Sequence, residues 1–221
     1  MTPVIGIANK KGGVGKSSIT HLFSFTSANV PIDKKVLVID CSENKGLTYL
    51  SLFNNQSTYT IVQSDLIGVP KVLNAEVDNF ELIIIDFPTH TGMPGFKTAA
   101  LCCSNFIIPT GVGIMDQIST KSFLGEVEEI EKLRKAAGYE TDVCVLATNT
   151  HSLEEVNSFY NTLNQQKIKH FEYGLLTDAY IAYAIEKSGP VMDYVTEGVD
   201  WTPAQHIFHN VFIEFHKQFE N

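Results

Sequence analysis

The residues of this chain whose types and spacing best suit chemistry lie near its start, in a glycine-rich segment. The apolar run Val4–Ala8 precedes the segment and a helical pattern follows it. A glycine-rich turn between a strand and a helix points backbone N–H groups outward at the positive helix end, where phosphate oxygens bind. Lys16 is placed to contact the outer phosphates, and the Ser17 hydroxyl to bind Mg²⁺ directly. The predicted nucleotide-binding residues of this segment are Lys11, Gly12, Gly13, Val14, Gly15, Lys16, Ser17 and Ser18.

The start of the segment departs from the strict phosphate-loop motif, which has a glycine where this chain has Lys10. Lys11 comes next, and a lysine at this position cannot easily fold back onto phosphates that its own backbone holds. It is therefore available to a phosphate presented by a second subunit. The alternative is a glycine-rich turn whose lysines only improve solubility. The strand before the segment and the amphipathic stretch after it favour the phosphate loop.

The pattern Lys-Gly-Gly-Val-Gly-Lys-Ser over residues 11–17 resembles the deviant Walker A motif of the ParA/MinD family of ATPases. In that family the first lysine is the signature residue and crosses the dimer interface. The resemblance implies ATP or ADP and Mg²⁺ as cofactors, an ATP-dependent homodimer, and catalytic roles for Lys11 and Lys16.

Two carboxylates follow predicted buried strands. Val36–Ile39 ends at Asp40, which is placed to orient or deprotonate a water that attacks the γ-phosphate. A helix N-cap or turn aspartate is the alternative. Leu82–Ile85 followed by Asp86 has the form of a Walker B strand, whose carboxylate holds magnesium through water. We expect Asp40 and Asp86 both to contact Mg²⁺ through water.

The resemblance also extends to the segments after these strands. In the family the strand that corresponds to Val36–Ile39 ends in a catalytic aspartate, which is commonly followed two residues later by Asp-Pro-Gln. This chain has Cys-Ser-Glu-Asn at residues 41–44, so Asp40 is retained and Ser42 replaces the second aspartate. This departure implies slow or differently regulated turnover. Phe87–Thr89 lies where the family carries its second switch.

Asn149 ends the predicted strand at 143–148, a position from which a side-chain amide can read adenine with a paired donor and acceptor. In MinD-like relatives an asparagine at this place contacts the base. The alternative is an Asx-turn that opens the next helix.

Three of the seven histidines share one C-terminal helical pattern: His206, His209 and His216. No metal-binding motif accompanies them. An apolar stripe runs along the same stretch: Phe208, Val211, Phe212, Phe215 and Phe219. The stripe predicts a helix that docks on the core, and the scarcity of basic residues beside it argues against a membrane-docking helix.

Strand-like and helical segments alternate along the chain. The predicted strands are Val4–Ala8, Val36–Ile39, Leu82–Ile85, Phe106–Ile108 and Val143–Ala147. A helix is expected over 17–28, and another over 116–137 with Ile118, Phe123, Val127, Ile130 and Leu133 on its apolar face and Gly138 at its C-cap. The order predicts an α/β fold with a doubly wound, mostly parallel sheet flanked by helices, as in the three-layer P-loop NTPases, in one domain over residues 1–221.

Composition limits the partners. The 221 residues carry a net charge of −9, and Arg134 is the only arginine. Non-specific DNA binding needs a concentrated basic patch, so we expect it to be weak. The four cysteines lack CxxC spacing and are expected to be reduced thiols. No apolar run approaches the roughly 18 residues of a membrane span, and no signal peptide is recognisable, so the sequence predicts a cytoplasmic protein without a membrane partner.

The resemblance covers most of the chain, including the strand at 106–109 and the segment Gly189–Val191. No N-terminal helix-turn-helix is recognisable in the sequence. Tyr180–Tyr183 stands where short ParA proteins commonly carry an arginine. The resemblance implies a short ParA-type ATPase that acts in plasmid or chromosome partition with a ParB-like or cargo partner. The alternatives are a nucleotide-gated positioning scaffold that does not bind DNA, and a metabolic P-loop ligase or transferase.

Overall fold

The computed structural model describes residues 2–29, 32–53, 58–177 and 203–219. The segments 180–183 and 189–191 named above lie outside the described residues. Six described strands form one sheet: β1 (Val4–Ile7), β2 (Val36–Asp40), β3 (Thr60–Gln63), β4 (Leu82–Asp86), β5 (Asn105–Thr110) and β6 (Asp142–Ala147). The helices are α1 (Lys16–Ser27), α2 (Gly46–Phe53), α3 (Val69–Glu76), α4 (Phe96–Leu101), α5 (Ile114–Ala136), α6 (Leu153–Gln165) and α8 (Pro203–Phe219), with a 3-10 turn η1 at Val77–Asn79.

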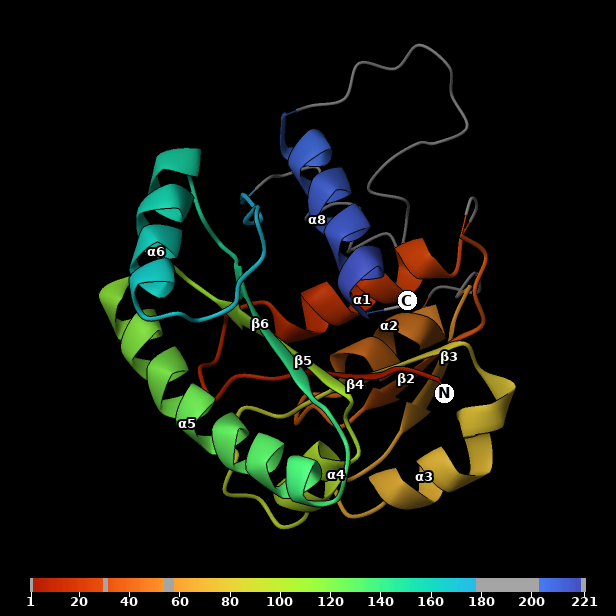
Figure 1. The fold of residues 1–221 in the computed structure, drawn as a ribbon. Coiled ribbons are helices and arrows are strands. Elements are labelled where there is room, and N and C mark those ends of the chain that lie inside the picture. The colour runs from red at the N-terminus through yellow and green to blue at the C-terminus, as the bar shows by residue number, and fades with distance from the viewer. Residues whose placement is uncertain (1, 30–31, 54–57, 178–202, 220–221) are drawn as a thin grey trace.

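The sheet is parallel throughout, with the strand order β3-β2-β4-β1-β5-β6 (Figure 1). The central strands are almost wholly apolar because helices cover both faces of a parallel sheet. The predicted doubly wound parallel sheet is confirmed, and β3 is a strand that the sequence pattern did not predict. β3 pairs at the sheet edge and is only partly buried, so it lacks the continuous apolar run of the other strands.

Alternate side chains of each strand enter two cores, one on each face of the sheet. One core joins the sheet to α1, α2 and α8, and the other joins it to α3, α4, α5 and α6. On the first face Phe23 of α1 stacks on Phe215 of α8, with ring centroids 4.4 Å apart. The apolar stripe of α8 is buried as predicted, which places this C-terminal helix directly on the helix that follows the glycine-rich segment (Figure 1).

Helix α5 differs in one respect from the sequence prediction. Phe123, Val127 and Ile130 are buried, but Ile118 and Leu133 are 58% and 43% exposed, so their placement in the buried stripe was wrong. Ile118 lines a solvent-open hollow between α5 and α6 instead of the core. Gly138, with φ 87°, follows the C-cap of α5.

Candidate nucleotide-binding site

The glycine-rich segment forms the turn between β1 and α1, and its backbone requires glycine at two places. Gly13 and Gly15 have φ of 76° and 88°, in the left-handed region that side chains strain to enter. Apart from the glycine itself and its two chain neighbours, no described residue has a heavy atom within 4 Å of the position that a Cβ would take on Gly12, Gly13 or Gly15. α1 begins at Lys16 without a described side-chain cap. The turn is therefore an open cradle with helix N–H groups left for an anion.

Asn9, two residues after the end of β1, anchors the start of this loop. Its Oδ1 accepts a hydrogen bond from the backbone N–H of Lys11 at 3.0 Å. Its Nδ2 donates to the carbonyl of Pro109 at 2.9 Å and to the hydroxyl of Thr120 at 3.0 Å. Asn9 is fully buried, so this contact ties the loop to β5 and α5.

The end of β6 holds the middle of the loop. The Thr148 hydroxyl donates to the carbonyl of Val14, and the Asn149 amide donates to the carbonyl of Gly13, both at 2.8 Å. Two loop carbonyls are thereby held by the residues that follow β6. Asn149 itself has φ 54°. It makes this loop contact, whereas the cap of α6 is Ser152.

Lys16 lies across the loop. Its amino group donates to the carbonyl of Lys11 at 3.3 Å and to the hydroxyl of Thr89 at 3.2 Å. Burial lowers the pKa of Lys16, while the charges of Asp86 and Glu43 act in the opposite direction. A half-buried cation with weak neutral partners is suited to a phosphate anion.

Ser17 and Asp86 meet beside Lys16. The Ser17 hydroxyl donates to Oδ2 of Asp86 at 2.6 Å. Oδ1 of Asp86 is buried and has no hydrogen-bond partner among the described residues. Burial raises the pKa of Asp86 to about 7; the Ser17 hydrogen bond lowers it and the charge of Asp40 raises it. A hydroxyl and a carboxylate oxygen with spare capacity are the hard donors that Mg²⁺ prefers, so these residues fit a magnesium site.

Asp40 lies next to Asp86 across the β2–β4 ladder, and its carboxylate contacts the segment that follows β2. Oδ1 accepts from the N–H and hydroxyl of Ser42 at 3.1 and 2.5 Å. Oδ2 accepts from the N–H and hydroxyl of Thr48 at 2.9 and 2.7 Å. The side chain is fully buried. These are the contacts of a helix-capping aspartate at the start of α2, the alternative that the sequence left open.

Two cavities flank the loop. One, of about 310 Å³, is lined by Gly13, Gly15, Lys16, Ser17, Ser18, Ser42, Glu43, Asn44, Gly46, Phe87, Pro88 and Thr89. The other, of about 440 Å³, is lined by Lys11, Gly12, Gly13, Val14, Gly111, Val112, Gly113, Asp116, Asn149, His151 and Glu155. Of the predicted loop residues, residues 15–18 line only the first cavity and Gly13 lines both. The second cavity is lined by Lys11, Gly12 and Val14, together with Asn149.

No family model and no curated protein matches the sequence. Solved structures do match the fold. The MinD cell division protein of Aquifex aeolicus superposes with a TM-score of 0.71 at 16% identity, over 98% of each chain. A Borrelia burgdorferi protein assigned to plasmid partition, bound to AMPPNP, gives 0.67 at 18% identity, over 99% of this chain and 100% of that chain. The chain has the MinD and ParA fold.

The same P-loop NTPase architecture also occurs in a metabolic enzyme. Cobyrinic acid a,c-diamide synthase of Mycobacterium smegmatis, bound to ADP and magnesium, matches with a TM-score of 0.65 at 13% identity, over 85% of this chain and 92% of that chain. The fold alone therefore does not choose between a switch and a synthase.

The two lysines at the start of the loop have partners on α5. Lys11 is 42% exposed and its amino group lies 3.6 Å from Oδ1 of Asp116. Lys10 pairs with Glu126. Lys11 lines the second cavity and not the phosphate cavity, and its partner Asp116 was not singled out from the sequence. Asn9, Thr48 and Thr148 were also missed, although each lies within two residues of a strand end or in the first turn of a helix.

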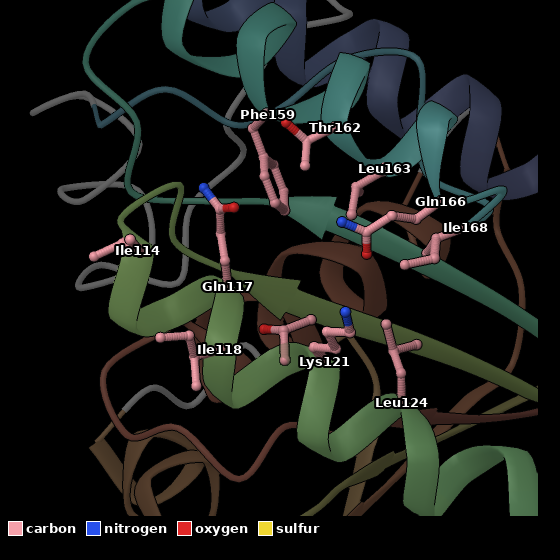
Figure 2. Close-up of a pocket in the computed structure, with 11 residues that line it drawn as sticks. Ile114, Gln117, Ile118, Lys121, Leu124, Phe159, Thr162, Leu163, Gln166 and Ile168 are labelled. Atoms are coloured by element: carbon pink, nitrogen blue, oxygen red, sulfur yellow. The ribbon is translucent and has the colours of Figure 1, made fainter.

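A hollow between α5 and α6 has a mostly apolar lining, unlike a phosphate site. It has a volume of about 170 Å³ and lies between α5 and α6, where Figure 2 shows Leu124, Phe159 and Leu163 facing one another. Lys121 is the one charged residue in its lining among the described residues.

The described residues contain no cluster of histidine, cysteine or carboxylate side chains able to hold a metal by itself. Cys41, Cys103 and Cys144 are buried and Cys102 is half-buried, all as free thiols, as predicted. Within the described ranges, no helix combines the length and apolarity that a membrane span requires.

Proposed function

We propose that this chain is a weak, Mg²⁺-dependent ATPase of the ParA/MinD type, whose ATP-bound dimer acts as a switch in plasmid or chromosome partition. The observation that carries the proposal is the grouping of Lys16, Ser17 and Asp86 at an open glycine cradle. Lys16 and the loop N–H groups bind the phosphates, Ser17 binds Mg²⁺ directly, and Asp86 holds its water shell. The AMPPNP and ADP-magnesium complexes of the structural neighbours support this choice of ligands.

Calorimetric titration with ATP and Mg²⁺ tests nucleotide binding. Lys16→Ala is expected to abolish binding because the cation that faces the phosphates is lost. Lys10→Ala is the matched control: it removes a lysine of the same loop whose partner is Glu126 and which does not line the phosphate cavity. Equal affinity in Lys16→Ala and Lys10→Ala would reject this assignment of the loop.

Lys11 is proposed to act on the nucleotide of a facing subunit. Its ion pair with Asp116 is long and partly exposed to solvent, so it contributes little and can be exchanged for a phosphate. ATP should then favour a two-fold dimer and ADP the monomer. Sedimentation with AMPPNP tests this: Lys11→Ala should bind nucleotide and remain monomeric, whereas Lys10→Ala should dimerise. Dimerisation of Lys11→Ala to the wild-type extent would exclude the role in trans.

Adenine recognition is assigned to Asn149, which lines the cavity on the Lys11 side of the loop. Its amide would exchange the Gly13 carbonyl for the base. Asn149→Ala is expected to weaken ATP and GTP binding to the same low level, because the donor and acceptor that distinguish the bases are gone. Unchanged selectivity for ATP over GTP would remove this role.

The partner is proposed to be a ParB-like adaptor or a cargo protein, and DNA to be at most a weak ligand. A net charge of −9 supports this order of preference, and it equally suits the second candidate, a positioning scaffold that does not bind DNA. DNA titration at low salt with ATP, ADP or no nucleotide separates the two. ATP-dependent binding supports partition, and its absence supports the scaffold.

A further inference from the structure

The hollow between α5 and α6 has apolar side chains on both sides and enough room for a small ligand. Leu124 lines it from α5, and Phe159 and Leu163 line it from α6 (Figure 2). Its volume of about 170 Å³ slightly exceeds that of an engineered apolar cavity of about 150 Å³ that binds benzene. Ile118, which also lines it, is 58% exposed, so the hollow is open to solvent. An apolar body of about six carbons therefore fits this space.

One cation accompanies the apolar lining. Lys121 is the only charged lining residue in the part of the chain that the structure describes, and it lies on α5 across from Gln166 of α6 (Figure 2). The α5 residues one turn away, where a carboxylate could pair with it, are all uncharged: Gln117, Ile118, Leu124 and Gly125. Within residues 2–29, 32–53, 58–177 and 203–219, no hydrogen bond or ion pair reaches the Lys121 side chain. Its charge is therefore available to an anion from outside the chain.

A lysine without a carboxylate partner contrasts with other lysines of this acidic protein, in which 25 carboxylate residues outnumber 16 basic ones. Several lysines on or near α5 and β6 have such a partner: Lys10 with Glu126, Lys11 with Asp116, Lys132 with Glu128 and Lys169 with Asp142. Lys121 instead lies beside an apolar hollow, where a ligand can bring the carboxylate.

The C-terminal end of α6 does not need this lysine as a cap. Backbone carbonyls at a helix end attract cations when they lack hydrogen-bond donors. Here the N–H groups of residues 166–168 donate to the carbonyls of Thr162, Leu163 and Asn164. The last turn of α6 is thus closed by its own backbone, which leaves the Lys121 ammonium for a stronger acceptor.

We propose that this hollow is a binding site for a small monocarboxylic acid with an apolar body of about six carbons. The body packs between Leu124, Phe159 and Leu163, and the carboxylate pairs with Lys121. The apolar lining disfavours a second charge on the ligand, and Lys121 repels a cationic head group. The hollow shares no lining residue with the two cavities that flank the glycine-rich loop, so the site is independent of the proposed ATPase function.

NMR titration of the nucleotide-free chain with sodium butanoate, hexanoate and octanoate at constant ionic strength tests the site. Amide signals of α5 and α6 around the hollow should shift, with dissociation constants in the millimolar range for ligands of this size. The affinity should rise about 4-fold per methylene from butanoate to hexanoate, because each methylene leaves water. The gain per methylene should be smaller from hexanoate to octanoate, because the longer body exceeds the hollow.

The role of Lys121 is tested with hexanol, which has the same apolar body without the charge. Hexanol should bind about 5-fold more weakly than hexanoate, the upper range for an ion pair open to solvent. Lys121→Met keeps an apolar stem of similar length, so it should reduce hexanoate affinity to that of hexanol and leave hexanol binding unchanged. Lys132→Met is the matched control, since Lys132 is an exposed lysine of the same helix that pairs with Glu128 outside the hollow. It should match the wild type.

Three results would overturn the proposal. The first is the absence of shifts around the hollow at tens of millimolar hexanoate. The second is shifts confined to residues 11–18, which would place the carboxylate at the glycine-rich loop. The third is equal binding of hexanoate to the wild type and Lys121→Met, which would show an apolar crevice without selectivity for an acid. None of these results bears on ATP binding, so each would leave the proposed function standing.

Discussion

His21, in the second turn of α1, should make the protein less stable in mild acid. The side chain is 1% exposed, and burial lowers its pKa from 6.5 to about 4. Its Nδ1 lies 2.6 Å from the Tyr59 hydroxyl, whereas Nε2 is buried without a partner among the described residues. In the folded state, no acceptor among the described residues faces Nε2, so the N–H that protonation adds to the ring would be buried without a hydrogen bond.

The sign of the effect follows from proton counting. Between pH 6.5 and 4 the unfolded chain binds a proton on His21 and the folded chain does not, so stability falls as the pH falls through this range. With the two pKa values above, the free energy of unfolding should drop by about 2 kcal/mol between pH 7 and pH 5 from this residue alone. Most of the loss lies below pH 6.5.

Urea denaturation at pH 7 and pH 5 measures the drop. His21→Asn is the informative variant, since its amide oxygen can still accept from Tyr59 but cannot take up a proton. Its drop should be smaller than that of the wild type by about 2 kcal/mol. His151→Asn changes an exposed histidine and should leave the drop unaltered. Equal drops in the wild type and His21→Asn would show that His21 is accessible to protons in the folded state, and the reasoning from burial would be refuted.

Three other outcomes are expected. Asp40→Ala should lower the free energy of unfolding by about 2–4 kcal/mol in urea titrations, because four partly buried hydrogen-bond donors lose their acceptor; a loss below about 0.5 kcal/mol would contradict the capping role. Phe215→Ala should lower the free energy of unfolding by about 3–5 kcal/mol in the same measurement, since it removes the ring that stacks on Phe23. A loss as small as that of a surface substitution would contradict the docking of α8. Any non-specific DNA binding should vanish near physiological salt in a fluorescence titration, and persistence there with a steep salt slope would contradict the expected scarcity of basic patches.

The sequence was sufficient to predict the elements that carry a strong local signal. Buried parallel strands such as Leu82–Ile85 are continuous apolar runs, and the glycines at 13 and 15 mark positive backbone angles that few other residues accept. The carboxylates at the ends of β2 and β4 were located for the same reason, because a polar residue after such a run falls at the sheet edge. The edge strand β3 lacked this signal, being only partly buried.

The partners of the site residues could not be read from spacing. Asn9 contacts Pro109 and Thr120 across about a hundred residues of chain, and Thr148 reaches Val14 across an even longer separation. Such contacts depend on which strands become neighbours in the sheet. The orientation of Asp40 was likewise open, because an aspartate after a strand can face a ligand or cap the next helix, and here Ser42 and Thr48 supply the cap contacts.

Helix α1 is buried on every side from Ile19 to Ser27, between the sheet and α8. An ordinary surface helix can accumulate substitutions on its outward face, but this one has no outward face. Each of these nine positions should therefore resist change in a saturation-mutagenesis library, with small hydroxyl residues such as Ser24 tolerating neither growth nor charge. In a lineage whose structural neighbours share under a fifth of their residues with this chain, the loop and the helix behind it should be the slowest-evolving stretch, and a search profile built on residues 4–27 should recover distant relatives that the full-length sequence does not.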